Sequence, residues 1–305
     1  MCGIAGIIHR GKSSNVGSEM TSMLVALKHR GPDSSGFAVY GEPKSGEFLM
    51  RIKVAEQEDM DKGRGATTLI RDRNCQIDEI LTEHNVEVKE KENITAYALR
   101  YVISHNGDVV AMAQHIEEVG GVEILSLGSC LELVKDLGDA TIVSEQYGLS
   151  NFRGTHAIGH TRMATESDVD IRSAHPYWAF PYNDIAVVHN GQITNYWMMR
   201  REMERKGHRF MSDCDSELLA VYTANNLANG ASLSESLHSS INEIDGVFTY
   251  LVATQDQLGM AKDTMAAKPL VLYESDNFIA MASEEVAIRS ILPQEIETYD
   301  PYDEE

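Results

Sequence analysis

The first eleven residues, MCGIAGIIHRG, constrain the fold and the chemistry of this chain more than any other stretch. A cysteine directly follows the initiator methionine and leads into a short apolar run, which is typical of a strand covered on both faces. In such a strand Cys2 is an ordinary small apolar residue. Alternatively, Met1 is removed and Cys2 becomes a nucleophile whose own α-amine serves as its base. The opening alone favours the apolar interpretation, so the rest of the chain must decide.

Beyond this strand the chain alternates between short apolar runs and amphipathic segments. Strands are predicted at 3–9, 34–41, 157–165 and 185–193, with a further series between 248 and 285. Helices are predicted at 18–31, 194–207, 215–230 and 232–246. The last of these begins with a capping box, Ser232 and Glu235. Because strands come in runs and helices in pairs, we expect stacked antiparallel sheets covered by helices in one domain over 1–305.

The segment from 41 to 153 gives weaker signals, and we assign no chemistry to it. We predict a strand at 47–55, a hairpin over 94–113 that turns at Asn106–Gly107, and a short helix at 128–138. The chain ends in an acidic tail at about 296–305, in which YDPYDEE (299–305) is expected to be disordered.

Charge and cysteine content exclude several classes of function. The chain has 47 Asp and Glu against 26 Lys and Arg, a formal charge of −21, which repels phosphate backbones and anionic lipids. We therefore expect no nucleic acid and no membrane as partner, and no apolar run approaches the roughly 20 residues that span a bilayer. The start lacks a secretory signal and the four cysteines lack metal-ligand spacing, so we expect a cytoplasmic protein with reduced thiols and no metal.

Five short stretches combine polar residues with apolar or glycine neighbours: MCGIAGI, HRGPDSSG, GHTRMAT, HNGQITN and SDCDSE. Hydrolysis of an amide by a cysteine needs a thiolate, a base, donors for the oxyanion and a grip on the charges of the substrate. The α-amine of an N-terminal cysteine titrates near pH ~8 beside the thiol, so one residue can supply both nucleophile and base. The side-chain amide of Asn190 and the backbone N–H of Gly191 resemble an oxyanion hole.

Two charged residues complete this set. Arg162, at the end of a predicted strand, can bind a carboxylate bidentately, and Asp215, at a predicted helix start, can hold an ammonium group. Each has an ordinary alternative, because such an arginine is usually a surface residue and such an aspartate is usually a helix cap. Together with Cys2 they describe a site for a free amino acid with a reactive side-chain amide, which is glutamine or asparagine.

The same stretches, with SAHPY and the closing KPLVLY…ASEE, resemble the class II glutamine amidotransferases over about residues 2–40 and 154–290. The resemblance implies an α+β fold, the four-layer αββα sandwich of two antiparallel sheets called the N-terminal-nucleophile hydrolase fold. It also implies a long α/β insertion at about 41–153. In that family the leading Met is removed and the exposed cysteine attacks the amide of glutamine, which reverses our first interpretation of Cys2.

Carried over residue by residue, the resemblance assigns two sets of site residues. The catalytic set contains the nucleophile, whose freed amine is the general base, and the two oxyanion donors: Cys2, Asn190 and Gly191. The substrate-binding set contains Arg162, Thr165 and His175 for the α-carboxylate, Asp215 for the α-amino group, and Arg30, which orders the N-terminus and the site. One position departs from the family, which often has an aromatic residue where this chain has Met163.

The resemblance also bears on partners and cofactors. No synthase, sugar-isomerase, phosphoribosyl-binding or flavin-binding segment follows SEEVAIRSIL, so we expect a separate synthase subunit that receives the ammonia. The layout resembles the amidotransferase subunit of split glutamate-synthase-like systems, including N-methylglutamate synthase. Partner subunits there carry flavin (FMN) and an iron–sulfur cluster, and no cofactor is expected in this chain. The insertion at 41–153 is either a surface elaboration or a docking surface or gate for the partner.

Three alternatives stay open. The chain could be another N-terminal-nucleophile amide hydrolase such as an acylase, although an acylase need not grip both ends of a free amino acid. It could be a non-catalytic glutamine-binding or scaffold subunit, although every expected catalytic position is filled. A metal site would have to use four histidines that fall on strands and loops without an interleaved acid or thiol: His156, His160, His175 and His189.

Overall fold

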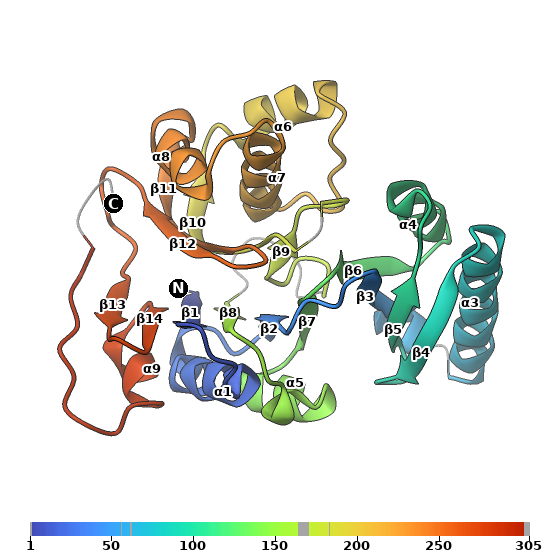
Figure 1. Ribbon diagram of the computed structural model, residues 1–305, viewed down its shortest axis with the longest axis horizontal. Coiled ribbons are helices and arrows are strands. Elements are labelled where there is room, and N and C mark those ends of the chain that lie inside the picture. Colours follow the sequence, from blue (N-terminus) through green and yellow to red (C-terminus); the bar gives the residue numbers. More distant parts are fainter. Residues whose placement is uncertain (1, 56, 62, 164–170, 183, 302–305) are drawn as a thin grey trace.

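The computed structural model describes residues 2–55, 57–61, 63–163, 171–182 and 184–301. Two antiparallel sheets face each other in its main body (Figure 1). The six-stranded sheet has the order β13-β14-β1-β8-β2-β7, with strands at Val271–Glu274, Phe278–Ala282, Gly3–His9, His156–Arg162, Ser34–Tyr40 and Leu131–Leu137. The four-stranded sheet has the order β12-β11-β10-β9, with strands at Leu258–Lys262, Gly246–Ala253, Ala186–Ile193 and Tyr177–Trp178.

Strand β1 occupies the middle of the six-stranded sheet because its sequence lets both faces be covered. It pairs antiparallel with β14 on one side and with β8 on the other. Ala5 and Ile7 pack on the helix side of the sheet, whereas Ile4 belongs to the core between the sheets. Gly6 also faces the second sheet, where a Cβ would come within 2.9 Å of the side chain of Leu251 on β11. Glycine at this position therefore lets the two sheets approach closely.

Helices cover the outer face of each sheet, which confirms the predicted four-layer αββα sandwich (Figure 1). Those on the six-stranded sheet are α1 (Val16–Ala26), α5 (Ala140–Gln146) and α9 (Glu285–Arg289), with short 3₁₀ turns η1 (Lys28–Arg30) and η2 (Leu149–Asn151). Those on the four-stranded sheet are α6 (Tyr196–Arg205), α7 (Asp215–Ala228) and α8 (Leu233–Glu243). The capping box of α8 forms as predicted. None of the helices in the described part of the chain is long and apolar enough to cross a membrane.

Residues 47–128 form a separate layered unit beside the sandwich, here called the inserted unit, at the right of Figure 1. Its sheet has the order β4-β5-β3-β6, with strands at Glu87–Asn93, Ala98–Ser104, Glu47–Lys53 and Glu123–Gly128. Its helices are α2 (Gln57–Met60), α3 (Arg64–Glu83) and α4 (Val109–Glu117). Apolar side chains of α3 and α4 pack against β3 and β5. Together with apolar side chains of the sandwich they form one continuous core.

The predicted hairpin at Asn106–Gly107 is wrong. Strand β5 ends at Ser104, and helix α4 begins after Asp108 instead of a second strand. The carboxylate of Asp108 accepts hydrogen bonds from the backbone N–H groups of residues 110 and 111, at 3.0 Å each. This is an N-cap, which satisfies the free donors of the first helical turn and favours a helix over a return strand.

The predicted helix at 128–138 is also wrong, because this segment is strand β7. It pairs with β2 over seven residues, and its neighbouring residues Leu133 and Val134 enter cores on opposite faces of the sheet. Charged residues at buried positions of this strand obscure its alternation in the sequence. Since β7 belongs to the six-stranded sheet, the inserted unit ends before residue 131, whereas the insertion predicted from the sequence runs to about 153.

The chain is held in place at Tyr299 and Pro301, contrary to the disorder expected for YDPYDEE (299–305). The backbone of Tyr299 forms a two-way antiparallel bridge with Leu272 of β13, at 2.9 and 3.0 Å. The Nζ of Lys262 donates to the carbonyl of Pro301 at 3.1 Å. These contacts attach the end of the chain to an edge strand of each sheet.

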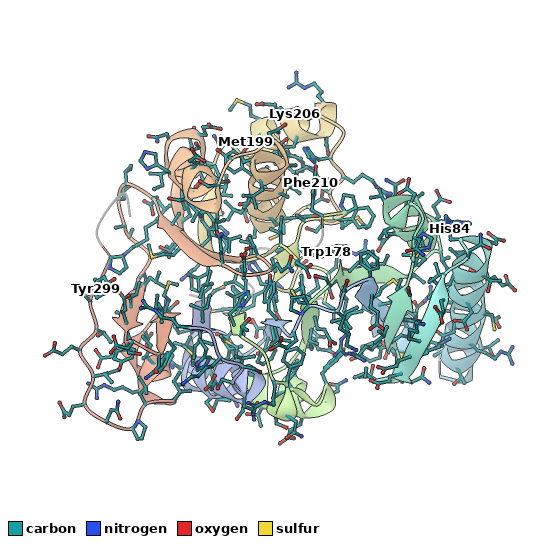
Figure 2. All side chains as sticks on the ribbon, in the orientation of Figure 1. His84, Trp178, Met199, Lys206, Phe210 and Tyr299 are labelled. Atoms are coloured by element: carbon teal, nitrogen blue, oxygen red, sulfur yellow. The ribbon has the colours of Figure 1, made fainter. Side chains whose placement is uncertain are left out.

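Buried polar contacts fix the inserted unit to the sandwich. The indole N–H of Trp178, labelled in Figure 2, donates to the carbonyl of Ile124 on β6 at 3.2 Å. Glu123, also on β6, lies 2.9 Å from the Nζ of Lys53 on β3 and 3.6 Å from the Nζ of Lys135 on β7. Burial alone would raise the pKa of Glu123, but these two lysines lower it to about 2. Glu123 is therefore an ionised carboxylate held between two buried lysines.

Candidate active site

The candidate site lies between the two sheets, at the end where β1 begins and β8 finishes. Gly3 pairs with Thr161, so Cys2 lies beside the last residues of β8. The side of β8 that carries Gly159 packs on helix α1, because a Cβ there would meet Met20. The alternate residues of β8, including His160 and Arg162, consequently face the second sheet.

Cys2 is partly exposed, and its neighbours come from three distant parts of the chain. Its Sγ lies 3.9 Å from the carbonyl oxygen of Met163. Its own carbonyl accepts hydrogen bonds from Arg30 Nε at 2.9 Å and from Asn190 Nδ2 at 3.1 Å. The structure thus brings together the predicted nucleophile and one predicted oxyanion donor, which are 188 residues apart in the sequence.

Arg30 holds the N-terminal segment from the side of α1. Its guanidinium is buried and pairs with Glu284, besides donating to the carbonyl of Cys2. Burial would raise the pKa of Glu284, but hydrogen bonds from Arg30 and His29 hold it below the usual range. Arg30 therefore contacts the backbone of residue 2, a geometry that fits the predicted role of ordering the N-terminus.

Glycines in the stretch HRGPDSSG explain how this turn reaches the site. A Cβ at Gly31 would lie 2.4 Å from the carbonyl carbon of Arg162, and a Cβ at Gly36 would lie 1.9 Å from the carbonyl oxygen of His175. Only glycine permits such close backbone contact. The two glycines therefore bring the end of β8 and the segment before β9 against β2.

Gly191 on β10 has no room for a side chain. Its φ is 152°, and a Cβ would lie 2.1 Å from the carbonyl oxygen of Val247 on β11. Asn190, one residue earlier, is buried and points to Cys2. The two predicted oxyanion residues therefore lie on a strand whose backbone position is tightly fixed by its neighbour.

Three buried histidines surround the start of this strand segment. The ring of His160 stacks on that of His175, with centroids 4.0 Å apart and planes 17° apart. His160 Nε2 lies 3.2 Å from the carbonyl of His189, and the N–H of His189 donates to His175 Nδ1 at 3.3 Å. Burial lowers the pKa of His160 to about 3 and that of His175 far below its usual value, so both rings are neutral at pH 7. His175, predicted to help bind the α-carboxylate, uses its Nδ1 to hold β10.

Asp215 is the first residue of α7, where a carboxylate also complements the helix dipole. One carboxylate oxygen, Oδ2, accepts a hydrogen bond from the N–H of Ile193 at 2.8 Å. The other, Oδ1, accepts from the hydroxyl of Ser216 at 3.2 Å. That hydroxyl also lies 2.8 Å from His189 Nδ1. The side chain of Asp215 remains 21% exposed, which leaves the carboxylate accessible to a small cation.

Two predicted site residues remain, Arg162 and Thr165. Arg162 is buried near the stacked rings of His160 and His175, and its positive charge contributes to their low pKa values after burial itself. Thr165 lies outside the described residues.

The four histidines considered as a metal site do not form one cluster. His156 stacks on Tyr40 and its Nε2 lies 2.7 Å from the carbonyl of Thr254, away from the other three. In the ranges that the structure describes, no group of three or more His, Cys, Asp or Glu side chains is arranged to hold a metal ion.

Sequence reasoning assigned no role to Glu284 or Ser216 and considered His189 only as a metal ligand, although all three touch predicted site residues. A weak signal exists for Glu284, because a buried arginine such as Arg30 requires an anionic partner. The sequence does not say which of the 47 acidic residues supplies it. Ser216 and His189 follow and precede predicted site residues directly, so adjacency is their only signal.

The comparisons with known proteins agree on one family. A family model described as a glutamine amidotransferase domain matches residues 160–290. A putative glutamine amidotransferase of Methanothermobacter thermautotrophicus is 38% identical over 99% of this chain and 97% of its own length. The glutamine amidotransferase-like protein GlxB of Rhizobium meliloti is 32% identical over 93% of this chain and 89% of its own.

More distant matches are longer proteins that carry the same fold. An amidophosphoribosyltransferase of Methanocaldococcus jannaschii is 28% identical over 62% of this chain and 40% of its own. The solved structure of glutamine phosphoribosylpyrophosphate amidotransferase from B. subtilis superposes on 99% of this chain with a TM-score of 0.61, at 17% identity. This chain spans 46% of that one. With its two facing antiparallel sheets and these relatives, the chain belongs to the class II glutamine amidotransferases and has their N-terminal-nucleophile hydrolase fold.

Proposed function

We propose that this chain is a glutaminase subunit, which hydrolyses glutamine through a thioester at Cys2 and passes the ammonia to a separate synthase subunit. The observation that carries the proposal is the contact between Asn190 Nδ2 and the carbonyl of Cys2, at 3.1 Å. It brings a side-chain amide donor to the residue whose thiol would attack the substrate, and so close to where the oxyanion of the substrate amide would develop. The family membership supports the use of glutamine as the amide.

In the proposed reaction Met1 has been removed and the α-amine of Cys2 takes the proton of its thiol. The thiolate attacks the side-chain amide carbon of glutamine, and the negative oxygen of the tetrahedral intermediate is stabilised by Asn190 Nδ2 and the N–H of Gly191. The protonated amine then gives its proton to the leaving nitrogen, which departs as ammonia. Water attacks the resulting γ-glutamyl thioester and releases glutamate and the free thiol of Cys2.

The charged ends of glutamine would be held on opposite sides of this centre. Arg162, with Thr165 and His175, is proposed to bind the α-carboxylate, and Asp215 the α-ammonium. The burial of Arg162 and the partly exposed carboxylate of Asp215 support these roles, since a buried guanidinium makes strong bidentate pairs with carboxylates. Recognition of both ends would distinguish free glutamine from glutamine within a peptide.

A separate ammonia acceptor is supported by the lengths of the relatives. The two relatives that match nearly end to end are themselves described only as amidotransferases. The phosphoribosyl-transferring relatives have more than half of their length outside the match. We propose that the acceptor is a glutamate-synthase-like or N-methylglutamate-synthase-like subunit, in which flavin and an iron–sulfur cluster would reside.

The experiment is the intact mass of the protein after incubation with 6-diazo-5-oxo-norleucine, a glutamine analogue that alkylates nucleophiles. We expect one adduct on a chain that lacks Met1, none on Cys2→Ala, and one on Cys75→Ala, which removes an exposed thiol in the inserted unit. Saturating glutamine should slow labelling of the wild-type protein. A chain that retains Met1 and takes up no label would contradict the proposal and favour a glutamine-binding scaffold.

A further inference from the structure

The first two residues of α7 clamp the strand segment that carries the oxyanion residues. At one end of this segment His189 Nδ1 lies 2.8 Å from the hydroxyl of Ser216. At the other end the N–H of Ile193 donates to Asp215 Oδ2 at 2.8 Å. Asn190 and Gly191 lie between the two attachment points. The oxyanion segment and the carboxylate of Asp215 are therefore parts of one hydrogen-bonded ring.

The protons in this ring can be assigned from donor and acceptor chemistry. The hydroxyl of Ser216 has one proton, and it donates to Asp215 Oδ1 at 3.2 Å, because an ionised carboxylate can only accept. The contact between Ser216 and His189 must then be a donation from His189 Nδ1–H to the hydroxyl oxygen. A neutral histidine with Nδ1–H has an unprotonated Nε2.

The surroundings of His189 Nε2 agree with this assignment. This nitrogen is buried, has no hydrogen-bond partner among the described residues, and lies 2.8 Å from where a Cβ of Gly191 would be. A protonated Nε2 would be an unsatisfied buried donor, which costs more than a bare nitrogen. Burial lowers the pKa of His189 in spite of the nearby Asp215, so the ring is neutral at pH 7.

Oδ2 of Asp215 is thus held by the N–H of Ile193, and Oδ1 is held by the hydroxyl of Ser216 at 3.2 Å, with the weaker thiol donor of Cys214 at 3.8 Å. Two fixed oxygens fix the plane of the carboxylate. Each carboxylate oxygen has two lone pairs, so an acceptor site remains on Oδ2 for a further donor such as an ammonium group. Loss of the Ser216 contact would leave Oδ1 with only the weak thiol contact of Cys214, while Oδ2 stays attached to Ile193.

We propose that Ser216 and the Nδ1–H form of His189 are positioning residues that orient the Asp215 carboxylate toward the α-ammonium of glutamine, and so determine selectivity for substrates that carry an α-amino group. The inference rests on the proposed function, because it takes the role of Asp215 from it. A purely structural role for Ser216 makes a different prediction, since it would weaken all ligands of the site equally.

The test compares two ligands by calorimetric titration of the Cys2→Ala protein, which binds without turnover. L-glutamine carries the α-ammonium, and glutaramate is the same molecule without the α-amino group. Adding Ser216→Ala should raise the Kd for L-glutamine roughly tenfold, the size expected for one charge-assisted hydrogen bond, and change that for glutaramate less than twofold. Ser216→Thr keeps the hydroxyl and should restore L-glutamine binding.

A matched control is Ser240→Ala, which removes another buried, hydrogen-bonded serine from a helix on the same sheet, 2.7 Å from Tyr250 OH. It should leave both Kd values unchanged. Equal weakening of L-glutamine and glutaramate by Ser216→Ala, or no weakening, would overturn the inference while leaving the proposed function intact. A Cys2→Ala protein that binds no L-glutamine at all would overturn both.

A spectroscopic measurement keeps the inference testable if Ser216→Ala does not fold. In ¹⁵N-histidine-labelled protein, the resonances that disappear in His189→Asn belong to His189. We expect a neutral ring with the proton on Nδ1. In Ser216→Thr, which keeps the hydroxyl, the ¹⁵N resonances of His189 should shift only slightly. A ring protonated on Nε2 at pH 7 would overturn the proton assignment and with it the orientation of Asp215.

Discussion

Two regions of this protein bury polar side chains, and they do so by opposite means. Around the candidate site the strands are fixed mainly by neutral imidazoles and an amide that bond largely to backbone atoms: His160, His175, His189 and Asn190. The buried guanidiniums of Arg30 and Arg162 lie beside them. Where the inserted unit joins the sandwich the buried groups are ions in pairs, such as Glu123 with Lys53 and Lys135.

The difference reflects what each region has to do. A neutral ring can fix a strand without adding a strong local charge, so the charges of the substrate can dominate the field of the site. A buried ion pair fixes two elements in a specific geometry, but removing one partner leaves the other charge unpaired in a dry environment. Substitutions at the site should therefore change activity most, whereas substitutions at the junction should change stability most.

The largest expected effect is at Cys2. Replacing it by alanine should reduce glutamate formation from glutamine by at least ~10⁴-fold, because the nucleophile of a covalent mechanism is lost. The melting temperature should stay within about 2 °C, since the side chain is partly exposed and makes one weak contact. Coupled glutamate detection and thermal unfolding check both parts. Residual activity above a few per cent would break the assignment of Cys2.

The matching change at the junction is Glu123→Gln. It removes the Glu123 carboxylate from Lys53 and Lys135 and should cost about 3–5 kcal/mol of unfolding free energy, measured by urea titration at pH 7. Glu87→Gln, which breaks an exposed ion pair with Lys89 on the same sheet, should cost less than about 1 kcal/mol.

The junction also predicts an acid limit. The pKa of Glu123 is about 2 in the folded protein against 4.5 ordinarily, so its contribution is complete above pH 4.5 and is lost as the pH falls toward 2. In Glu123→Gln the free energy of unfolding should therefore not show this loss between pH 4.5 and 2. An unchanged pH profile in Glu123→Gln would show that the carboxylate is not held as an ion.

Asn190→Ala should act on catalysis more than on folding. Loss of one oxyanion donor typically lowers kcat by about 10²–10³-fold, and the KM for glutamine should change little. Asn195→Ala is the control. Asn195 lies five residues after Asn190, and its side chain forms hydrogen bonds with the backbone of the loop at 243–245. A similar loss of kcat in both variants would mean that Asn190 acts through the strand and not on the oxyanion.

From the neutral histidines we expect a second range of pH, at milder acidity, over which the free energy of unfolding changes. The pKa of His160 is about 3 in the folded protein against 6.5 ordinarily, so unfolding takes up a proton below pH 6.5 and stability falls as the pH is lowered. Between pH 7 and 5 this one residue should account for about 2 kcal/mol. His156, His175 and His189 shift in the same direction, so His160→Gln should flatten the urea midpoint against pH only in part. An unchanged slope would contradict the buried neutral state.

The sequence predicted the elements of the sandwich well, because their apolar periodicity is undisturbed. In the inserted unit it identified strand β3 but predicted a strand in place of helix α4, and it predicted a helix for the return strand β7, where tertiary contacts decide. In β7 the charged residues at 132, 135 and 136 are buried by partners from other elements, so the strand does not show clean alternation. Helix α3 was missed altogether, since its exposed side is polar along most of its twenty residues.

For the site, the sequence identified residues that are distinctive in their local stretches, and the fold brings Cys2 and Asn190 into contact. Their catalytic and binding roles stay predictions. Glu284 and Ser216 belong to the quoted stretches ASEE and SDCDSE, but their supporting roles could not be foreseen, because these roles are defined by the side chains they meet. Likewise, Gly31 and Gly36 were part of a quoted stretch, but only the close backbone contacts explain why they must be glycine.

The smallest expected effect is at Ser232, and its alanine variant is the reference for effects that come from lost stability alone. Ser232 caps α8 on the outer face of the sandwich, where its hydroxyl accepts from the N–H of Glu235 and its own N–H donates to the Glu235 carboxylate at 2.8 Å. Ser232→Ala removes only the side-chain half of this box and should cost about 1 kcal/mol of unfolding free energy, with kcat and KM unchanged. Because the cap lies in neither polar region, a change in glutamine turnover here would mean that lost stability alone reaches the site. The effects expected at Asn190 would then have to be corrected for stability before they could be assigned to chemistry.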